Sequence, residues 1–252
     1  MCLILFALDV DPEYRVVLAA NRDEFYRRET AALHAWEDLG IIGGRDLQAG
    51  GTWLALSAEG TRMSAVTNVR DGIAEPQPGL RSRGQLPVDF LDGGNSAEYA
   101  AAALTATAAQ YAPVNLLVDD GAQMWWATNH NGPRAARIEP GVHGLSNAAL
   151  DDPWPKVVLG VAELRAHMES GDTNPESLLT MLHNTRTAAP ESLPDTGVTP
   201  EQEEALSAMF LVGPEYGTRA STVVRIRHGG GGDITERRWN VDGVVSTERI
   251  SF

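Results

Sequence analysis

The feature that most constrains the fold is a short apolar segment at the start of the chain, followed by a turn and a second apolar segment. Residues Cys2–Leu8 and Tyr14–Ala20 have the composition of buried strands, and the turn-forming segment Asp9–Glu13 separates them. Two strands joined by so short a connection pair antiparallel. The sequence therefore predicts a β-hairpin at the N-terminus, whose first strand begins at the only cysteine of the chain.

Further strands and helices follow in runs. We predict strands at Thr52–Ser57, Met63–Thr67, Val114–Asp119, Gln123–Ala127, Ser221–Arg227 and Ile234–Trp239. We predict helices at Arg83–Leu91, Ser96–Gln110, Trp154–Glu169, Pro175–Thr185 and Pro200–Met209. Hairpin strands with grouped helices are typical of α+β layers rather than of a parallel doubly wound sheet. We therefore expect one α+β domain over residues 1–252.

Charge and cysteine content exclude several classes of protein. The net charge is -14 and the pI is about 4.8, which argues against non-specific nucleic-acid binding and against docking on an anionic membrane. A single cysteine excludes an internal disulfide and fits the cytosol. We see no signal peptide, no apolar stretch of the ~20 residues that span a bilayer, and no histidine spacing that indicates a metal site. We expect a cytoplasmic protein.

Cys2 follows the initiator methionine, and this position has chemical consequences. When an aminopeptidase removes Met1, the cysteine carries the free α-amine. The α-amine titrates near pH ~8 and the thiol near ~8.5, so a proton passes easily between them. One residue then supplies both a nucleophile and a base. The alternative is a small core residue, since free cysteine is commonly buried and inert.

A polar tetrapeptide, Asn21-Arg22-Asp23-Glu24, follows the second strand of the hairpin. With a turn centred near Asp11, Cys2 lies opposite about Ala20, so the tetrapeptide lies beside the thiol. Arg22 would then favour the thiolate. Asp23 or Glu24 could hold the α-ammonium or orient the arginine. The alternative is a solvated strand end that carries surface charges.

Three later residues fit the same chemistry. Asn68 ends a strand opposite about Gly51, and its amide could donate to a developing oxyanion, a role worth ~3 kcal/mol of barrier. Asn147 could be a second oxyanion donor, and Arg219 a second cation near the thiolate. Each of the three also fits an ordinary capping or surface role.

Taken together, these residues resemble the NRDE family, also called the transport and Golgi organisation protein 2 family, which is named after the tetrapeptide Asn21–Glu24. The other segments that carry the resemblance, in chain order, are Met1-Cys2, Gly50–Ala55, Thr67–Arg70, Ser82–Gly84, Asp89–Leu91, His143–Asn147, Pro153–Lys156, Gly217–Arg219 and Ser221–Val223. The resemblance covers most of the chain. The family has been linked to haem trafficking, lipid metabolism and secretory organisation.

The family is in turn similar in pattern to N-terminal nucleophile (Ntn) hydrolases. This resemblance implies a four-layer αββα sandwich, with Cys2, Asn68, Asn147 and Arg219 in the order of those enzymes' catalytic residues. The second-strand segment departs from their pattern, because those hydrolases carry Arg-Asn-x-Asp there. Either Arg22 takes the place of the arginine with a shift, or Glu24 takes the place of the Asp and Asn21 that of the Arg.

Two functions remain open. The first is an N-terminal-cysteine amidohydrolase or acyl-transfer enzyme acting on an amide or thioester of a small molecule. Its catalytic residues would be Cys2, Arg22, Asp23, Asn68, Asn147 and Arg219, and its substrate-binding residues Asn21, Glu24 and Arg70, without a cofactor or a metal. The second is a non-enzymatic binding or trafficking protein for haem or an acyl-lipid, in which Cys2 or an exposed histidine would ligate the haem iron.

Overall fold

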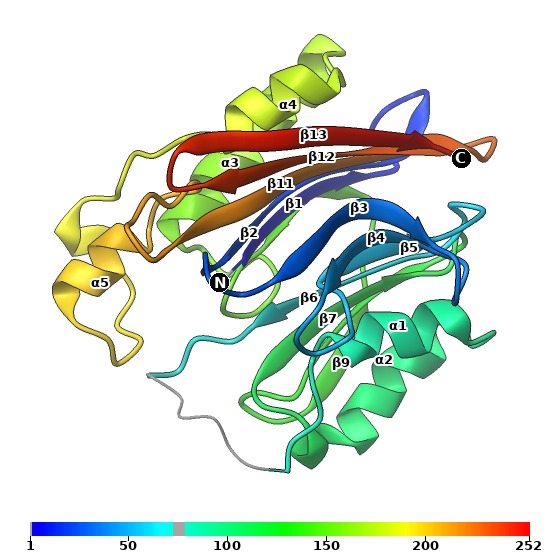
Figure 1. Cartoon of the computed structure of the whole chain (residues 1–252), viewed down its shortest axis with the longest axis horizontal. Helices are drawn as coiled ribbons and strands as arrows, with labels where there is room; N and C mark the ends of the chain where they lie inside the picture. The colour runs from blue at the N-terminus through cyan, green and yellow to red at the C-terminus, as the bar shows by residue number, and fades with distance from the viewer. Residues whose placement is uncertain (1, 73–78) are drawn as a thin grey trace.

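The computed structural model describes residues 2–72 and 79–252, and shows two antiparallel β-sheets with helices on their outer sides (Figure 1). Within these residues there are thirteen strands, five α-helices and two short 3-10 helices. The mixed α+β class and the antiparallel pairing predicted from the sequence are confirmed.

The first sheet has six strands in the order β10-β1-β2-β11-β12-β13. Their bounds are β10 Gly141–Leu145, β1 Cys2–Leu8, β2 Tyr14–Phe25, β11 Tyr216–Arg227, β12 Gly232–Asn240 and β13 Gly243–Ser251. The long strands β2 and β11 pair along most of their length. The polar end of β2, which carries the tetrapeptide, is therefore held on both sides, by β1 and by β11.

The second sheet has seven strands in sequence order, from β3 to β9. Their bounds are β3 Thr30–Trp36, β4 Ile41–Asp46, β5 Leu54–Ser57, β6 Met63–Asn68, β7 Val114–Asp119, β8 Met124–Thr128 and β9 Arg134–Arg137. Strands β1 and β6 approach each other from the two sheets.

Alternate side chains of β1 pack on opposite faces of the six-stranded sheet. Ile4, Phe6 and Leu8 join the apolar cluster between the two sheets. Leu3 and Leu5 join the cluster that the six-stranded sheet shares with α3 and α4. Successive side chains of a strand point to opposite faces, so a strand that is apolar at every position is buried on both faces. Cys2 has the same parity as Ile4 and therefore belongs to the face between the sheets.

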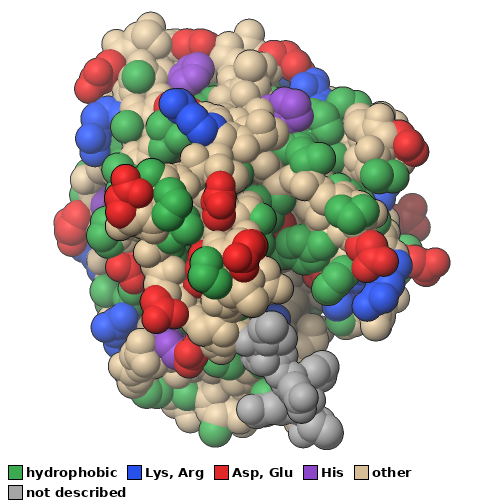
Figure 2. Space-filling view, turned by 90° about the vertical axis from the view of Figure 1, so that its left-hand side faces the viewer, with side chains coloured by type: hydrophobic (Ala, Val, Ile, Leu, Met, Phe, Trp, Pro, Cys, Tyr) green, Lys and Arg blue, Asp and Glu red, His purple; other side chains and the backbone are tan. Residues whose placement is uncertain are grey.

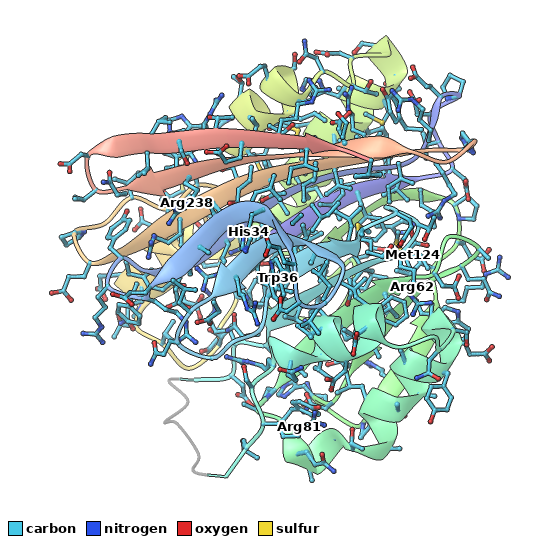
Figure 3. All side chains as sticks on the ribbon, turned by 45° about the vertical axis from the view of Figure 1, so that its right-hand side comes forward. His34, Trp36, Arg62, Arg81, Met124 and Arg238 are labelled. Atoms are coloured by element: carbon cyan, nitrogen blue, oxygen red, sulfur yellow. The ribbon has the colours of Figure 1, made fainter. Side chains whose placement is uncertain are left out.

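Helices pack on the outer side of each sheet (Figure 1). Their bounds are α1 Gln85–Asp92, α2 Ala97–Ala106, α3 Pro155–Ser170, α4 Pro175–Leu182 and α5 Pro200–Ala205, with 3-10 helices at Ala108–Gln110 and Pro190–Ser192. α1 and α2 cover the seven-stranded sheet, and α3 and α4 cover the six-stranded sheet. Arg62, labelled in Figure 3, stacks 4.0 Å from the Phe90 ring and donates to the Phe90 carbonyl, which ties α1 to its sheet. None of the described helices is long and apolar enough to cross a membrane.

The N-terminal hairpin forms as predicted, but its register differs. Cys2 pairs with Arg22 rather than with Ala20. The carboxylate of Asp11 accepts hydrogen bonds from the N–H groups of Glu13 and Tyr14, both at 2.8 Å. This Asx-type turn centres the connection one residue later than expected. The shift brings Arg22, rather than an alanine, beside the cysteine.

Several predicted boundaries were wrong. The helix predicted over Ser96–Gln110 ends at Ala106 and continues only as a 3-10 turn. The last predicted helix, Pro200–Met209, ends at Ala205. Strands β3, β4, β9, β10 and β13 were not predicted. Charged or glycine residues interrupt β4, β9, β10 and β13, whereas β3 is mostly apolar and was missed.

Candidate functional site

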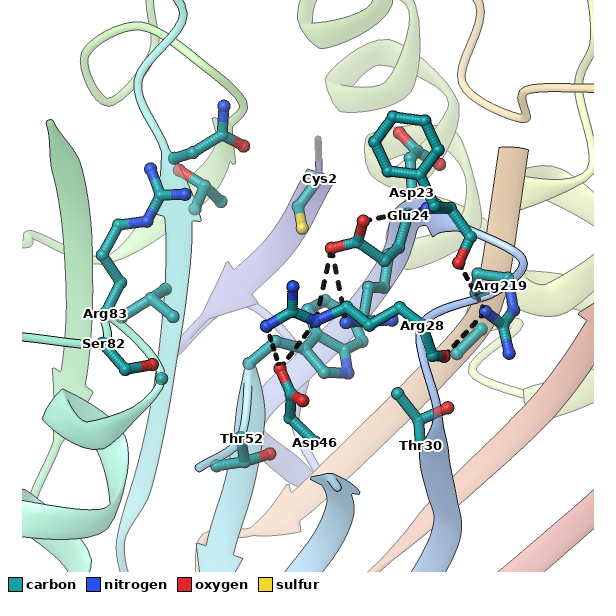
Figure 4. Close-up of a pocket in the computed structure, with 18 of the residues that line it drawn as sticks. Cys2, Asp23, Glu24, Arg28, Thr30, Asp46, Thr52, Ser82, Arg83 and Arg219 are labelled. Atoms are coloured by element: carbon teal, nitrogen blue, oxygen red, sulfur yellow. Dashed lines mark hydrogen bonds and ion pairs between the residues drawn. The ribbon is translucent and has the colours of Figure 1, made fainter. Parts of the chain in front are cut away.

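A cleft of about 790 Å³ opens between the two sheets, at the edge where β1 begins and β2 and β6 end. Cys2 and the end of β2 form one wall, and Thr67 and Asn68 belong to the other. Figure 4 shows Cys2 and Glu24 from the first sheet on one side and Ser82 and Arg83 on the other. Because the strands are antiparallel, the start of β1 and the ends of β2 and β6 meet at a single edge.

Cys2 is the first residue of β1, is 8% exposed and lines the cleft. The ladder pairs it with Arg22. A thiol and a guanidinium therefore lie side by side at the end of the hairpin. The structure brings these two predicted site residues together.

Burial raises the pKa of the Cys2 thiol above its usual value. The Asp23 carboxylate raises it further, while Arg22 opposes both effects. The prediction that neighbouring arginines lower this pKa is correct for Arg22, but burial outweighs that cation. A raised pKa disfavours the thiolate, so forming it requires a base or a change in solvation.

A chain of alternating charges runs from the cysteine into the second sheet (Figure 4). Arg22 lies 3.6 Å from the Glu24 carboxylate, and Glu24 lies 3.9 Å from Arg28. Arg28 in turn pairs with Asp46 of β4 at 2.7 Å. Glu24 also accepts from the N–H of Phe25. Glu24 therefore lies on the cleft wall, where the sequence analysis placed a substrate-binding residue, and already holds two arginines.

Asn21 does not lie in the cleft. Its amide donates to the carbonyl oxygens of Leu182 and Met209 and accepts from the Ser221 hydroxyl at 2.6 Å. Its odd position in β2 turns the side chain toward the helices. Asn21, which the sequence analysis assigned to substrate binding, therefore ties β2 to the end of α4 and to the segment after α5 and does not line the cleft.

Asp23 faces the helix layer like Asn21 but also lines the cleft. Its Oδ1 accepts from the Thr218 hydroxyl at 2.7 Å. Burial raises the pKa of this carboxyl, while Lys156 and the Thr218 hydrogen bond lower it. Asp23 is thus a buried acid in the segment that the sequence analysis placed beside the cysteine.

Asn68 and Asn147 form one unit rather than two independent donors. The Asn147 amide nitrogen donates to the backbone carbonyl of Asn68 at 2.9 Å and to its Oδ1 at 3.1 Å. The Oδ1 of Asn68 is thereby fixed as an acceptor, and its Nδ2 donates to no described residue. Asn147 is fully buried and is not a lining residue of the cleft. Its predicted role as a second oxyanion donor is replaced by that of orienting Asn68.

Arg70 and Arg219 are both occupied by contacts within the protein. Arg70 pairs with Glu203 at 2.7 Å and stacks 4.5 Å from the Trp154 ring. Arg219 donates from Nη1 to the carbonyl oxygens of Phe25, Tyr26 and Arg28. Figure 4 shows Arg219 directed at this backbone loop rather than at Cys2. Arg219 therefore shapes the loop after β2, and its predicted role as a second cation beside the thiol is corrected.

Sequence reasoning assigned no role to two residues of this region. Arg83 lies on the wall opposite Cys2, donates to the Pro113 carbonyl, and has no carboxylate partner among the described residues. Lys156, in the first turn of α3, is 2% exposed. Both belong to segments that carry the family resemblance, and Lys156 is the only lysine of the chain. The sequence alone shows that the chain has only this one lysine, so Lys156 could have been singled out there.

Comparison with known proteins identifies the family of this chain. The family model described as "Transport and Golgi organisation 2" matches residues 1–241. The chain belongs to this family. The match spans the whole cleft, from Cys2 on β1 to Arg238 on β12.

The family's members in animals are similar to this chain along nearly all of their length. The chain is 30% identical over 258 residues to the Transport and Golgi organization 2 homolog of Mus musculus, covering 94% of this chain and 92% of the mouse protein. It is 32% identical over 262 residues to the homolog of Bos taurus, with the same coverage. It is 29% identical over 252 residues to Transport and Golgi organization protein 2 of Drosophila melanogaster, covering 90% of this chain and 88% of the fly protein. These names describe a cellular process and no reaction.

Proposed function

We propose that this protein is a cysteine amidohydrolase or acyl-transfer enzyme that acts on an amide or thioester of a small molecule. The single observation that carries the proposal is the position of Cys2, which lies on the wall of a cleft, paired with Arg22, with Asn68 in the same cleft. A nucleophile, a cation and an amide donor are the parts that acyl transfer needs.

In the proposed reaction, removal of Met1 gives Cys2 a free α-amine. The amine accepts the thiol proton, and Sγ attacks the carbonyl carbon of the substrate. The Nδ2 of Asn68 donates to the oxyanion of the tetrahedral intermediate, while Asn147 holds that amide in place. The α-ammonium then returns the proton to the leaving amine or thiolate. Water or another acceptor attacks the resulting thioester and releases Cys2.

The remaining residues set the charge around the nucleophile. Arg22 favours the thiolate, and Asp23 is a buried anion beside it. Glu24 holds Arg22 against the wall of the cleft. Arg219 and Arg70 support the loops that border the cleft. These assignments retain Cys2, Arg22, Asp23 and Asn68 at the chemistry and move Asn147, Arg219, Arg70 and Asn21 to supporting positions.

The cleft favours a substrate that carries a carboxylate or a phosphate. Its described lining includes eight arginines and four acidic residues, whereas the whole chain has a net charge of -14. Figure 2 shows acidic side chains scattered over one outer face of the molecule. A positive cleft in a negative protein concentrates anions at that site.

We also propose the finer fold that the resemblance implies: one Ntn-hydrolase-like domain over residues 1–252, with the layers αββα. It is supported by two sheets with an apolar cluster between them and helix pairs on both outer sides. In such an arrangement, the start of the first strand borders the space between the sheets, and Cys2 occupies that position.

A second candidate is favoured by one observation, the burial of Cys2, which is 8% exposed and whose thiol pKa is raised by that burial. An unactivated cysteine in a cleft of about 790 Å³ also suits a protein that binds haem or an acyl-lipid without reacting with it. Pockets of this size hold drug-sized ligands. For haem, Cys2 is the axial ligand that the cleft offers, since no histidine is among its described lining residues.

The test separates the two candidates. Protein whose free N-terminal cysteine has been verified by intact mass is incubated with a panel of anionic and neutral acyl thioesters and N-acyl amines. We expect release of thiol or amine, and loss of that release in Cys2→Ser, which folds normally. Wild-type protein that binds acyl compounds or haem but hydrolyses nothing in the panel would support the binding function instead.

A further inference from the structure

Arg83 differs from most of the arginines that line the cleft. Eight arginines line it among the described residues. Five of them form an ion pair with a carboxylate of the protein: Arg22, Arg28, Arg45, Arg70 and Arg81. Within residues 2–72 and 79–252, Arg83, Arg219 and Arg238 form no such pair. The charge of these three cations is therefore not balanced by a carboxylate of the described chain.

Hydrogen bonds distinguish these three arginines from one another. Arg219 donates from Nη1 to three backbone carbonyls, and its Nε is buried without a partner. Arg238 donates from Nη2 to the carbonyl of Thr30 at 3.1 Å. Arg83 donates from Nη1 to the carbonyl of Pro113 at 3.0 Å. Its Nε and Nη2 donate to no described residue, and neither atom is buried. Of the three, Arg83 is the one whose Nε and Nη2 are both accessible and free of protein acceptors in the described chain.

Another arginine of this chain shows what such an edge binds. Arg225 of β11 donates from Nη1 to the carbonyl of Thr173 at 3.1 Å. Its Nε and Nη2 donate to the two carboxylate oxygens of Asp233, at 3.2 and 2.6 Å. The guanidinium is planar, so the N–H groups of Nε and Nη2 are parallel and match the two oxygens of a carboxylate. Arg83 makes the same kind of Nη1 contact, and it directs the same edge at no carboxylate of the described chain.

The backbone of Arg83 is held in place by the neighbouring sheet. The carbonyl of the next residue, Gly84, accepts from the N–H of Thr52 at 3.0 Å. A Cβ atom on Gly51 would lie 2.3 Å from that carbonyl oxygen, so only glycine permits this close approach. Because the segment is fixed on the chain that leads into β5, the guanidinium is pre-organised and loses little conformational freedom when it binds a ligand.

Arg83 and Cys2 lie on opposite walls of one cleft (Figure 4). Arg83 is half-buried, and an ion that is partly removed from water without a counter-charge loses hydration energy. A bound anion restores that energy through charge-assisted hydrogen bonds. One guanidinium edge balances one negative charge, whereas a phosphate monoester carries about -1.5 to -2 at pH 7. The site therefore suits a carboxylate better than a phosphate.

We propose that Arg83 is a specificity-determining residue of the cleft, which binds a carboxylate of the substrate through Nε and Nη2 while the reacting carbonyl lies at Cys2. This inference deepens the proposed function and rests on it for the position of the reacting bond. The substrate class is thereby narrowed to an amide or thioester that carries a second, ionised carboxyl group. That carboxylate lies on the Arg83 wall, opposite the nucleophile.

A test that needs no turnover uses alkylation of Cys2 by maleimides. Each maleimide carries a carboxylate at the end of a chain of two or five methylenes, and each is paired with its uncharged amide. The rates on Cys2 are followed by mass spectrometry of the N-terminal peptide, and free cysteine gives the baseline acid-to-amide ratio. With wild type we expect at least one chain length to exceed this baseline by about 10- to 100-fold, which is the contribution of a hydrogen bond to a charged group. No excess at either length would overturn the proposal.

Three variants locate the preference. In Arg83→Gln we expect the ratio to fall to the baseline. Arg81→Gln is the matched control, because it removes a neighbouring cation of the same cleft that already pairs with Asp89, and we expect it to keep the preference. Arg83→Lys keeps the charge but not the paired N–H groups, so an intermediate ratio is expected. An equal fall in Arg83→Gln and Arg81→Gln, or an unchanged ratio in Arg83→Lys, would refute the role of the guanidinium edge.

The alkylation test and the hydrolysis test fail separately. If the acid preference depends on Arg83 but no acyl compound is hydrolysed, carboxylate recognition stands and the enzymatic function falls. If acyl compounds are hydrolysed but Arg83→Gln leaves the ratio of kcat/KM for acid and amide substrates unchanged, the enzymatic function stands and the role of Arg83 falls. A phosphonate probe that exceeds the carboxylate probe in wild type but not in Arg83→Gln would overturn the choice of a carboxylate.

Discussion

The space between the two sheets has two ends that lie on the same pair of strands, β1 and β2, but carry different side chains. At one end, Phe6 and Leu8 of β1 pack against Val16 and Ile226 in an apolar cluster. At the other end, the same face of β1 carries Cys2, beside Arg22 of β2. The backbone ladder continues from one end to the other. The comparison shows that the site is made by replacing apolar side chains at the end of a ladder that the core holds rigid.

The largest expected effect falls at the apolar end. Phe6 is fully buried between the sheets, so Phe6→Ala removes a large side chain and leaves a cavity. We expect the free energy of unfolding to fall by about 3–5 kcal/mol, measured by urea denaturation, while Cys2→Ser changes it by less than about 1.5 kcal/mol. A similar loss of stability in both variants would mean that Cys2 is a core residue and would break the comparison.

Substitutions at the polar end are expected to change the free energy of unfolding less than Phe6→Ala does, but to lower the rate of hydrolysis strongly. Asn68→Ala removes the proposed oxyanion donor, and we expect a fall in kcat of about 10²–10³-fold. Asn147→Ala leaves the Asn68 amide unoriented, and a smaller fall is expected, because the donor is still present. Hydrolysis of the best substrate of the panel is the measurement. If Asn147→Ala costs more than Asn68→Ala at equal stability, Asn147 is the donor and the assignment must be reversed.

The smallest expected effect is on thermal stability, and it comes from an ion pair in the segment before Asn147. The His143 ring hydrogen-bonds Asp151 at 2.7 Å, and Asp151 also accepts from the N–H of Gly144. The hydrogen bond with Asp151 raises the pKa of His143. Burial raises the pKa of Asp151, but the hydrogen bonds from the His143 ring and from the Gly144 N–H, together with the charge of His143, outweigh it, and that pKa is lowered.

The sign of the pH dependence follows from these directions. The histidine contribution to stability is fully present below its unfolded pKa of ~6.5 and is lost as the pH rises through the higher folded value. The aspartate contribution is present above ~3.9 and is lost as the pH falls through the lower folded value. We expect the difference in melting temperature between wild type and His143→Gln to be greatest between about pH 3.9 and about pH 6.5, and to shrink by pH 9. A difference that is constant from pH 5 to pH 9 would exclude the ion pair.

Local sequence predicted the elements whose signals are local. The first hairpin follows from Cys2–Leu8, Tyr14–Ala20 and the turn between them, and β7 lies at Val114–Asp119 as predicted. The register could not be derived in the same way, because it depends on the Asx turn at Asp11. The edge strand β13, which carries Val244 and Val245 exposed to solvent, has no apolar face from which it could be recognised.

The candidate site was predictable as a set of residues but not as a set of roles. The residues Cys2, Arg22, Asp23 and Asn68 meet in the cleft because the antiparallel ladders end at one edge. Whether a polar side chain faces the cleft depends on partners that are distant in sequence. Asn21 is held by carbonyls from residues 182 and 209, and Arg219 by the loop after β2.

The most direct test of the central claim is to trap the acyl group on the protein. Wild type with a verified free N-terminal cysteine is mixed with an intact thioester or amide that it has been shown to hydrolyse. The reaction is quenched in acid within one turnover, and the protein is analysed by intact mass and by its N-terminal peptide. The account predicts a mass increase equal to the acyl group on Cys2, reversed by hydroxylamine and absent in Cys2→Ser. Turnover by wild type with no acyl group on Cys2, or unimpaired turnover by Cys2→Ser, would contradict it.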